Sequence, residues 1–247
     1  MKKLEGKAAL VTGGARGIGA AIARRLAKDG AAVAVNYSKS AKEAQAVAAG
    51  IIKEGGRAVA VKGDMSDAAQ ARAAVEAAFK EFGRLDILVN NAGRAEFAPL
   101  EAVDEKHVKA QFDLNVGGPV FATQAAALRF SKDGGSVINI SSVAANSSYP
   151  SMSVYSATKA AVEALTRVWA AELGPRGVRV NAVAPGATDT EMARPILGEE
   201  SRKAIVAATP LGRIGQPEDI ADAVAFLASD DARWVTGHVI RAAGGKN

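Results

Sequence analysis

The stretch KAALVTGGARGIGAAIARRLAKDG (residues 7–30) decides the fold class. Its first part, KAALV, is a short apolar run that ends at glycines, which is typical of a buried strand. Its last part repeats apolar residues at helical spacing, with Ile18, Ile22 and Leu26 on one face, and Gly30 can end the helix. The stretch therefore predicts a strand, a glycine-rich loop and a helix in direct succession.

The loop between the strand and the helix is TGGARGIG (residues 12–19). Gly13, Gly17 and Gly19 let the backbone turn tightly and approach a ligand with no side chain in the way. The helix N-terminus behind them has free N–H groups and the positive end of a dipole, which suit a pyrophosphate. The placement at the first strand–helix crossover favours a nucleotide site. The alternative is a tight turn that needs glycine for its own geometry.

Strand and helix patterns alternate along the rest of the chain. The strands are nearly all apolar, as strands covered on both faces must be, and this predicts an α/β fold: a Rossmann-type, doubly wound parallel sheet with helices on both faces. No linker or repeat divides residues 1–247, so we expect one domain. Further strands are expected within 31–37, 57–64, 85–93, 135–142, 177–186 and 238–245, and further helices within 40–56, 66–83, 104–129, 153–173 and 216–229.

Residues 186–212 break this alternation and contain Pro195, Pro210 and several glycines. We expect this segment to be a mobile substrate lid, since long irregular segments inside compact domains are often functional. The alternative is a surface excursion without a role. Ser66 or Asp67 is expected to cap the helix within 66–83, and Pro217 to lie in the first turn of the helix within 216–229.

Composition excludes several classes of protein. The chain is 49% apolar and 23% charged, with a net charge of +5 and no basic run, so we expect neither disorder nor nucleic-acid binding. The absence of cysteine excludes disulfides and thiolate chemistry and fits a reducing, cytoplasmic setting. Glu5 and Lys7 interrupt the early apolar stretch, and no apolar window is long enough for a membrane span. His107 and His238 have neither metal-ligand nor triad spacing, so no metal is expected.

The stretch SVYSATKAAV (residues 153–162) contains a tyrosine and a lysine, Tyr155 and Lys159, one helical turn apart. A phenol has a pKa of about 10, and a nearby ammonium lowers that pKa by favouring the phenolate. The pair is therefore suited to acid–base catalysis on a carbonyl group if a hydride donor lies beside it. Without such a neighbour it is an ordinary pair on a helix surface.

The spacing T-G-x-x-x-G-I-G resembles that of the short-chain dehydrogenase/reductase family, and the resemblance extends from GKAALVTGG to the C-terminal GG. It implies hydride transfer between a nicotinamide cofactor and a carbonyl or alcohol, with Tyr155 as acid and base and Lys159 beside it. It also implies a serine about a dozen residues before the tyrosine, matched by Ser142 with Ser141 as its neighbour, and a helical asparagine, matched by Asn115. The expected catalytic set is Asn115, Ser142, Tyr155 and Lys159.

The resemblance also implies the wall of the cofactor site. An acid after the second strand would repel a 2′-phosphate, and here no carboxylate follows that strand, whereas Arg16 and Lys39 are basic. We therefore expect NADP(H). The residues expected to bind it, besides Tyr155 and Lys159, are Gly13, Arg16, Gly17, Ile18, Gly19, Asn36, Tyr37, Ser38, Asp64, Met65, Asn91, Ala92, Gly93, Pro185, Gly186, Thr188 and Thr190.

Several alternatives stay open. The substrate is a small ketone, diketone or ring carbonyl, or else a 3-oxoacyl thioester on a carrier protein, for which Arg129 and Lys132 would be a thin docking patch. Ala243 replaces the aspartate that many relatives have before the last two glycines, which removes a polar contact at the C-terminal turn. A catalytically silent, NADP-binding regulatory protein is a different class on the same fold. The resemblance further implies a homotetramer, joined through helices within 104–129 and 153–173 and through the last strand.

Overall fold

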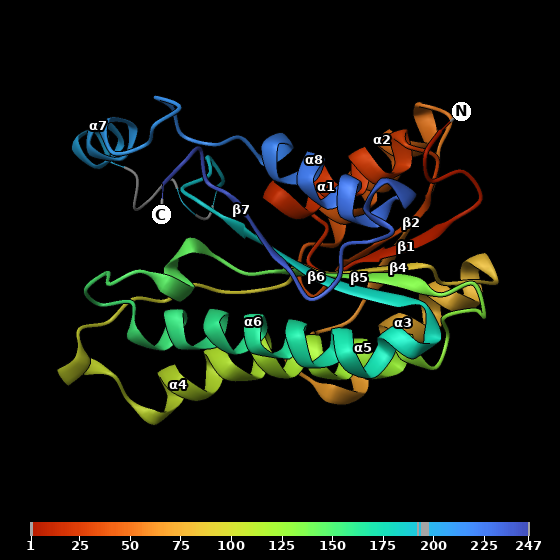
Figure 1. Cartoon of the computed structure of the whole chain (residues 1–247), viewed down its shortest axis with the longest axis horizontal. Coiled ribbons are helices and arrows are strands. Elements are labelled where there is room, and N and C mark those ends of the chain that lie inside the picture. The colour runs from red at the N-terminus through yellow and green to blue at the C-terminus, as the bar shows by residue number, and fades with distance from the viewer. Residues whose placement is uncertain (1, 192, 194–197, 247) are drawn as a thin grey trace.

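A seven-stranded, fully parallel sheet forms the centre of the computed structural model, which describes residues 2–191, 193 and 198–246 (Figure 1). The strand order is β3-β2-β1-β4-β5-β6-β7, so the order reverses between β1 and β4. This confirms the doubly wound sheet, and ligands of such sheets bind where the order reverses, outside the carboxyl ends of the strands. The strands are β1 (Ala8–Val11), β2 (Ala32–Tyr37), β3 (Arg57–Lys62), β4 (Ile87–Asn90), β5 (Gly135–Ile140), β6 (Val178–Pro185) and β7 (Val239–Ala242).

Helices cover both faces of the sheet. One face carries α1 (Gly17–Lys28), α2 (Ala41–Lys53) and α8 (Pro217–Ala228), and the other carries α3 (Ala68–Phe82), α4 (Glu105–Phe112), α5 (Gly118–Ala127) and α6 (Ser153–Leu173) (Figure 1). Short 3₁₀ turns span Leu100–Ala102, Val143–Asn146, Gly174–Arg176 and Asp230–Ala232. None of the helices among the described residues is long and apolar enough to cross a bilayer.

The apolar character of β1 follows from burial on both sides. Ala9 and Val11 point into the core that contains Ile22 of α1, whereas Leu10 points into the opposite core with residues of α3 and α5. Successive side chains of a strand alternate between faces, so every position of a strand sandwiched between helix layers must be apolar. This double burial produces the short apolar run that precedes the glycine loop.

The predicted helix over residues 104–129 is interrupted. α4 is followed by a π-helical turn, Asp113–Gly117, and then by α5. Asn115 lies in this turn and is buried, and Pro119 occupies the first turn of α5, where its missing N–H is tolerated. Such π turns insert one extra residue into a helix and are frequent at functional sites. The N-cap of α3, for which the sequence offered Ser66 or Asp67, is Asp67: its side chain accepts a hydrogen bond from the Gln70 N–H.

The segment 186–212 contains a helix that the sequence pattern did not predict, α7 (Glu199–Ala207). Every residue of α7 is exposed or half-buried, so it lacks the buried stripe that marks a helix packed on a core. Figure 1 shows α7 standing apart from the sheet. Residues 192 and 194–197, including Pro195 of the expected lid, lie outside the described residues, and the lid itself stays a prediction.

Candidate active site

The glycine loop joins β1 to α1 in a shape that only glycine permits. Gly13 and Gly17 have φ values of 61° and 52°, in the left-handed region. A Cβ on Gly19 would lie 2.3 Å from the Gly13 carbonyl oxygen and 2.5 Å from the Asn91 side-chain nitrogen. The loop therefore folds back on itself and leaves the start of α1 open.

Asn36, near the end of β2, supports the glycine loop. Its side chain is buried; Oδ1 accepts a hydrogen bond from the Gly13 N–H (3.1 Å), and Nδ2 donates to the carbonyls of Val61 (3.3 Å) and Gly63 (3.0 Å). All these partners are backbone groups of the loop, of β3 and of the residue that follows β3. The side chain thus stabilises the conformation of the glycine loop, and a contact of Asn36 with the cofactor stays a prediction.

The neighbouring residues form the rim that was expected to contact the cofactor. Tyr37 and Ser38 are half-buried, and the Ser38 hydroxyl donates to Asp64 Oδ2 (3.2 Å). The Ser66 backbone N–H and hydroxyl, both bonded to the Asp64 carboxylate, hold the pKa of that carboxyl below its usual value. Met65 is buried, and its side chain belongs to the core that also contains residues of α3 and α5.

The NNAG motif fastens the glycine loop to the centre of the sheet. Asn91 Nδ2 donates to the carbonyls of Thr12 (2.9 Å) and Gly13 (3.1 Å), and Thr12 Oγ1 accepts from the N–H groups of Asn91 (2.9 Å) and Ala92 (3.0 Å). Gly93 follows, and a Cβ there would lie 3.3 Å from Asn115 Oδ1 and 3.5 Å from Lys159 Nζ. The motif therefore links the loop on one side to the catalytic candidates on the other.

The segment after β6 reaches the glycine loop. Thr188 Oγ1 donates to the Gly186 carbonyl (3.0 Å), and a Cβ on Gly17 would lie 3.5 Å from Thr190 Cγ2. Pro185 ends β6, so residues 185–190 run from the sheet to the glycine loop. At the C-terminal turn, where Ala243 replaces an acid, backbone bonds such as Gly186 N–H to the Ala242 carbonyl (3.0 Å) make the contact instead.

Three catalytic candidates converge at the ends of β5 and α6. The hydroxyls of Tyr155 and Ser142 are hydrogen-bonded to each other, and Ser142 Oγ also accepts from the Ala144 N–H (3.1 Å). Lys159 Nζ donates to the Ile140 carbonyl (2.8 Å) and lies 5.8 Å from the centroid of the Tyr155 ring. The structure therefore brings together the serine, tyrosine and lysine that the sequence singled out.

Burial dominates the electrostatics of the pair. Burial raises the pKa of the Tyr155 phenol, and the hydrogen bond from Ser142 opposes this without reversing it. Burial also lowers the pKa of the Lys159 ammonium to about 8. Desolvation disfavours both charged forms and sets the net direction of both shifts, whereas the lowering of the phenol pKa by the lysine, which was expected beside a bound cofactor, stays a prediction.

Asn115 binds to the segment after NNAG. Its Oδ1 accepts from the Arg94 N–H (2.9 Å), and its Nδ2 donates to the Arg94 carbonyl (2.9 Å) and to Thr158 Oγ1 of α6 (3.0 Å). The side-chain amide thus pairs with one residue's backbone as a neighbouring strand would. Asn115 ties the π turn, the segment after β4 and α6 together.

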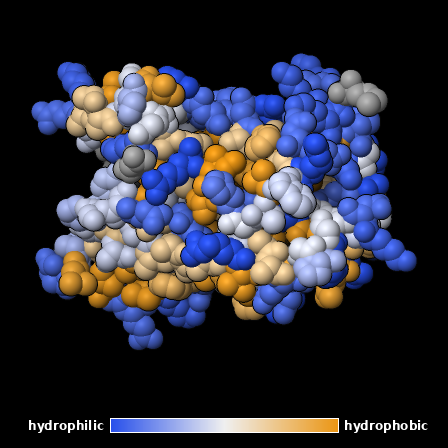
Figure 2. Space-filling model, viewed as in Figure 1, coloured by the Kyte–Doolittle hydropathy of each residue, from blue (hydrophilic) through white to orange (hydrophobic). Residues whose placement is uncertain are grey.

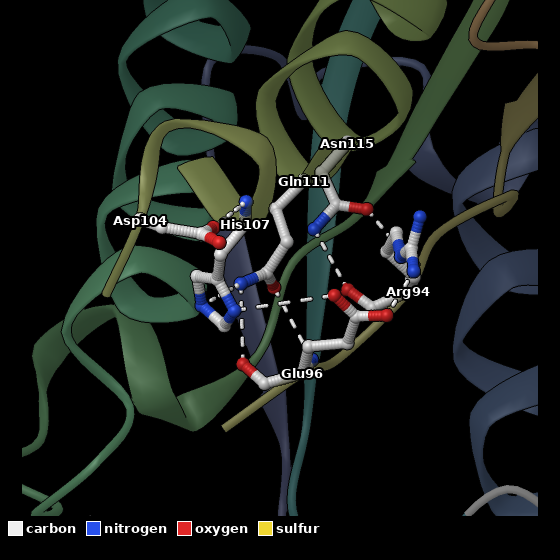
Figure 3. A network of polar contacts seen from close by, with 6 residues as sticks. All are labelled: Arg94, Glu96, Asp104, His107, Gln111 and Asn115. Carbon is white, nitrogen blue, oxygen red and sulfur yellow. Dashed lines mark hydrogen bonds and ion pairs between the residues drawn. The ribbon is translucent and has the colours of Figure 1, made fainter. Parts of the chain in front are cut away.

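Gln111 repeats this arrangement one turn earlier and was not singled out from the sequence. It is fully buried; Nε2 donates to the Glu96 carbonyl (3.1 Å) and Oε1 accepts from the Glu96 N–H (3.3 Å). Figure 3 shows both amides reaching the same segment, with His107 Nε2 2.9 Å from Gln111 Nε2. The sequence did contain a signal for Gln111: it lies four residues before Asn115, so a helix places both amide side chains on one face.

Phe97 is the other residue that sequence reasoning missed. It follows residues 94–96, which are bonded to Asn115 and Gln111, and its ring packs edge-on against Tyr155, with centroids 6.1 Å apart and an interplanar angle of 86°. Such edge-to-face pairs are a favoured aromatic geometry. No motif marks this residue, because its contact depends on where residues 94–96 are held. The phenol therefore has an aromatic neighbour on one side and Ser142 on another.

Comparison with known proteins agrees with this geometry. Residues 13–247 match the family model described as enoyl-(acyl carrier protein) reductase. An uncharacterized oxidoreductase of Methylorubrum extorquens is 57% identical over 247 residues, covering 99% of both chains. A hydroxynaphthalene reductase-like protein of Metarhizium brunneum is 43% identical over 257 residues, covering 99% of this chain and 96% of that one.

Solved structures give the same result. A short-chain dehydrogenase/reductase from Serratia marcescens superimposes with a TM-score of 0.94 at 42% identity, covering 98% of both chains. A short-chain dehydrogenase from Burkholderia cenocepacia, solved in complex with NADP, has a TM-score of 0.93 at 43% identity, again covering 98% of both chains. Matches of this extent and identity, together with the glycine loop and the Ser142–Tyr155–Lys159 cluster, show that this chain is an oxidoreductase that belongs to the short-chain dehydrogenase/reductase family.

Proposed function

We propose that the protein is an NADPH-dependent reductase that converts a ketone to a secondary alcohol, reversibly, within one catalytic domain. The observation that carries this proposal is the hydrogen-bonded Ser142–Tyr155 pair, with Lys159 beside it, at the sheet edge that also bears the glycine loop. Proton transfer and binding of a dinucleotide need these two features side by side.

The residues at the carboxyl ends of the strands suit a dinucleotide. A Cβ on any of several loop glycines would collide with backbone, so the loop surface is bare, and Arg16, the N-cap of α1, makes no side-chain capping bond among the described residues. The open N-terminus of α1 thus has N–H groups for a pyrophosphate. Arg16 and Lys39 are exposed at the rim, where a 2′-phosphate would be bound. The solved relatives bound to NADP and to NADPH, both 43% identical, support the same cofactor here.

The nicotinamide ring, when bound, supplies the hydride that reduces the carbonyl carbon. Tyr155 gives the phenolic proton to the carbonyl oxygen and takes it back when the alcohol is oxidised. The Ser142 hydroxyl, oriented by the Ala144 N–H, donates a hydrogen bond to that oxygen and stabilises the charge that develops on it. The Lys159 ammonium is held by the Ile140 carbonyl, with Nζ 5.8 Å from the centroid of the Tyr155 ring, and its charge favours the anionic form of the phenol.

The substrate is a small or ring ketone and not a thioester on a carrier protein. The aromatic ring of Phe97 beside Tyr155 suits an apolar or aromatic substrate. Arg129, half of the expected carrier-docking patch, is already paired with Glu76 through two nitrogens (2.8 and 2.6 Å), so an acidic carrier would compete with that carboxylate. The name of the hydroxynaphthalene reductase-like relative points to the same substrate class.

A tetramer is part of this proposal. Exposed apolar side chains lie on the helices expected to form contacts, including Val108 and Phe112 of α4 and Val168 of α6, and Trp234 before β7 is 97% exposed. Figure 2 shows apolar side chains gathered over α4 and at the centre of the same face. Burial of such side chains between subunits would remove them from water. A sizing measurement tests this directly.

The function is tested by NADPH oxidation with a panel of small and cyclic ketones, compared with NADH. The Tyr155→Phe variant is expected to lose about 10³-fold in turnover, because the proton donor is removed, while the Kd for NADPH changes by less than about threefold. Tyr149→Phe is the matched control, since Tyr149 contacts Lys246 and lies outside the cluster, and it should keep parental turnover.

Two results would overturn the proposal. Parental turnover in Tyr155→Phe would show that the phenol is not the acid. Tight NADPH binding without oxidation by any ketone of the panel would favour the alternative, a catalytically silent regulatory protein.

A further inference from the structure

One face of α6 has a third polar residue in register with the catalytic pair. Tyr155, Lys159 and Glu163 follow one another at intervals of four residues, so each lies one turn beyond the last on the same side of the helix. All three side chains bind the end of β5 or the segment that follows it: Tyr155 bonds to Ser142, and Lys159 bonds to the Ile140 carbonyl. The first two belong to the proposed chemistry, whereas the role of Glu163 is unassigned.

Glu163 is a buried carboxylate, with 7% of its surface exposed. Oε1 accepts a hydrogen bond from the Ser141 hydroxyl (2.8 Å), and Oε2 accepts one from Asn146 Nδ2 (3.0 Å). Burying a carboxyl group costs free energy unless its oxygens are bonded, and both are bonded here. Each donor comes from the same short stretch of chain, one at its start and one at its end.

That stretch contains the catalytic serine. Ser141 and Asn146 enclose residues 142–145, which form most of the 3₁₀ turn Val143–Asn146 with Ser142 as its N-cap. Because one carboxylate binds both ends of the turn, the distance between the turn and α6 is fixed at two points. The Ser142 hydroxyl therefore lies opposite Tyr155, which projects from the same helix two turns earlier.

We propose that Glu163 is a positioning residue that holds Ser142 against Tyr155 by fastening both ends of the turn that carries the serine. This inference rests on the proposed function, in which Ser142 stabilises the carbonyl oxygen. Glu163 does not touch substrate or cofactor; it acts through Ser141 and Asn146. Displacements of about 1 Å in a catalytic group can cost a hundredfold in rate, so a loosened turn lowers turnover. The glycine loop, on the far side of the crevice, is unaffected.

Three variants separate this role from general stability. Glu163→Ala removes both acceptors and is expected to lower kcat about 30-fold while the KM and Kd for NADPH stay within about twofold, because the loss is confined to the serine. Glu163→Gln retains most of the parental kcat, since its amide oxygen can accept from Asn146 and its NH₂ can donate to Ser141. Glu172→Ala, an exposed glutamate on the same helix, is the control and keeps full activity.

A double-mutant cycle with Ser142→Ala tests whether Glu163 acts through the serine. When Ser142 is already absent, Glu163→Ala should cost less than about threefold, because the group that it positions is gone. A full 30-fold loss in that background, or a Gln variant as impaired as the Ala variant, would overturn the proposal.

Amide hydrogen exchange gives a readout that does not depend on turnover. Exchange of residues 142–147 should accelerate in Glu163→Ala and not in Glu172→Ala, whereas exchange in the glycine loop stays unchanged. Unchanged exchange in residues 142–147 would contradict the positioning role even if the activity of the protein proved different. Accelerated exchange in a protein that reduces no ketone would contradict the proposed function alone.

Discussion

The two ends of the crevice are built on different principles. At the glycine-loop end, the surface proposed to bind the cofactor is backbone, and the side chains of Asn36 and Asn91 are hydrogen-bonded to that backbone. At the catalytic end, the facing groups are side chains, and backbone groups such as the Ile140 carbonyl and the Ala144 N–H orient them. The first end should therefore be sensitive to added atoms, and the second to the loss or titration of single functional groups.

The largest change in cofactor affinity is expected from one added methyl group at the first end. In Gly19→Ala the new Cβ would meet the Gly13 carbonyl oxygen at 2.3 Å, so the loop must open, and NADPH affinity should fall at least about 100-fold. Isothermal titration measures this.

Gly50→Ala is the matched control for that variant. Gly50 lies in α2 with no atom within 4 Å of an added Cβ, so alanine there should leave NADPH affinity unchanged and stabilise the protein by about 1 kcal/mol. If Gly19→Ala binds NADPH as the parent does, the backbone account of this end is wrong.

A smaller effect is expected from a side chain at the same end. Arg16→Ala removes an exposed guanidinium that we propose binds the 2′-phosphate, and the affinity for NADPH is expected to fall about tenfold. Affinity for NADH, which lacks that phosphate, should stay within about twofold, so the preference between the cofactors changes by the same factor.

Arg24→Ala serves as the control, because Arg24 is exposed about two turns into α1. Equal losses of affinity for NADPH and NADH in Arg16→Ala would show that the arginine does not bind the 2′-phosphate.

The smallest effect is expected from titration at the catalytic end. Burial lowers the pKa of Lys159 to about 8, so its ammonium form dominates below that pH and is lost above it. An anionic dinucleotide binds the charged form better, and its binding takes up protons. The Kd for NADPH should therefore rise about threefold to fivefold between about pH 7 and about pH 9.

Fluorescence titration across this range provides the measurement, and Lys159→Met provides the comparison. The variant should bind NADPH with a Kd that stays flat over the same interval, because the titrating group is absent. A wild-type profile without a rise, or the same rise in Lys159→Met, would assign the pH dependence to another group.

Local patterns predicted most of what lies within one turn or one strand. The start and end of α6 coincide with the expected range 153–173, and Tyr155 and Lys159 share a face because helical periodicity requires it. The three loop glycines were identified by their place between a strand and a helix. Such features depend on neighbours within about four residues, which the sequence displays directly.

Roles that depend on distant partners were missed. The hydrogen bonds of the Asn36 amide to Gly13 and Gly63 were not predicted, because these residues approach Asn36 only through the pairing of β1, β2 and β3. Gln111 and Phe97 acquire their contacts because the segment after β4 passes across α4 and α6. The π turn at Asn115 likewise reflects an amide bonded to a residue 21 positions away.

The sequence by itself determined the parallel α/β sheet, the glycine loop and the spacing of the tyrosine–lysine pair, because each follows from periodicity and backbone stereochemistry over short distances. Only the tertiary structure decided which polar side chains face the crevice and which support it, and that burial raises the pKa of Tyr155. Those outcomes depend on desolvation and on hydrogen bonds across strand and helix pairings, such as Asn91 to Thr12 over 79 residues.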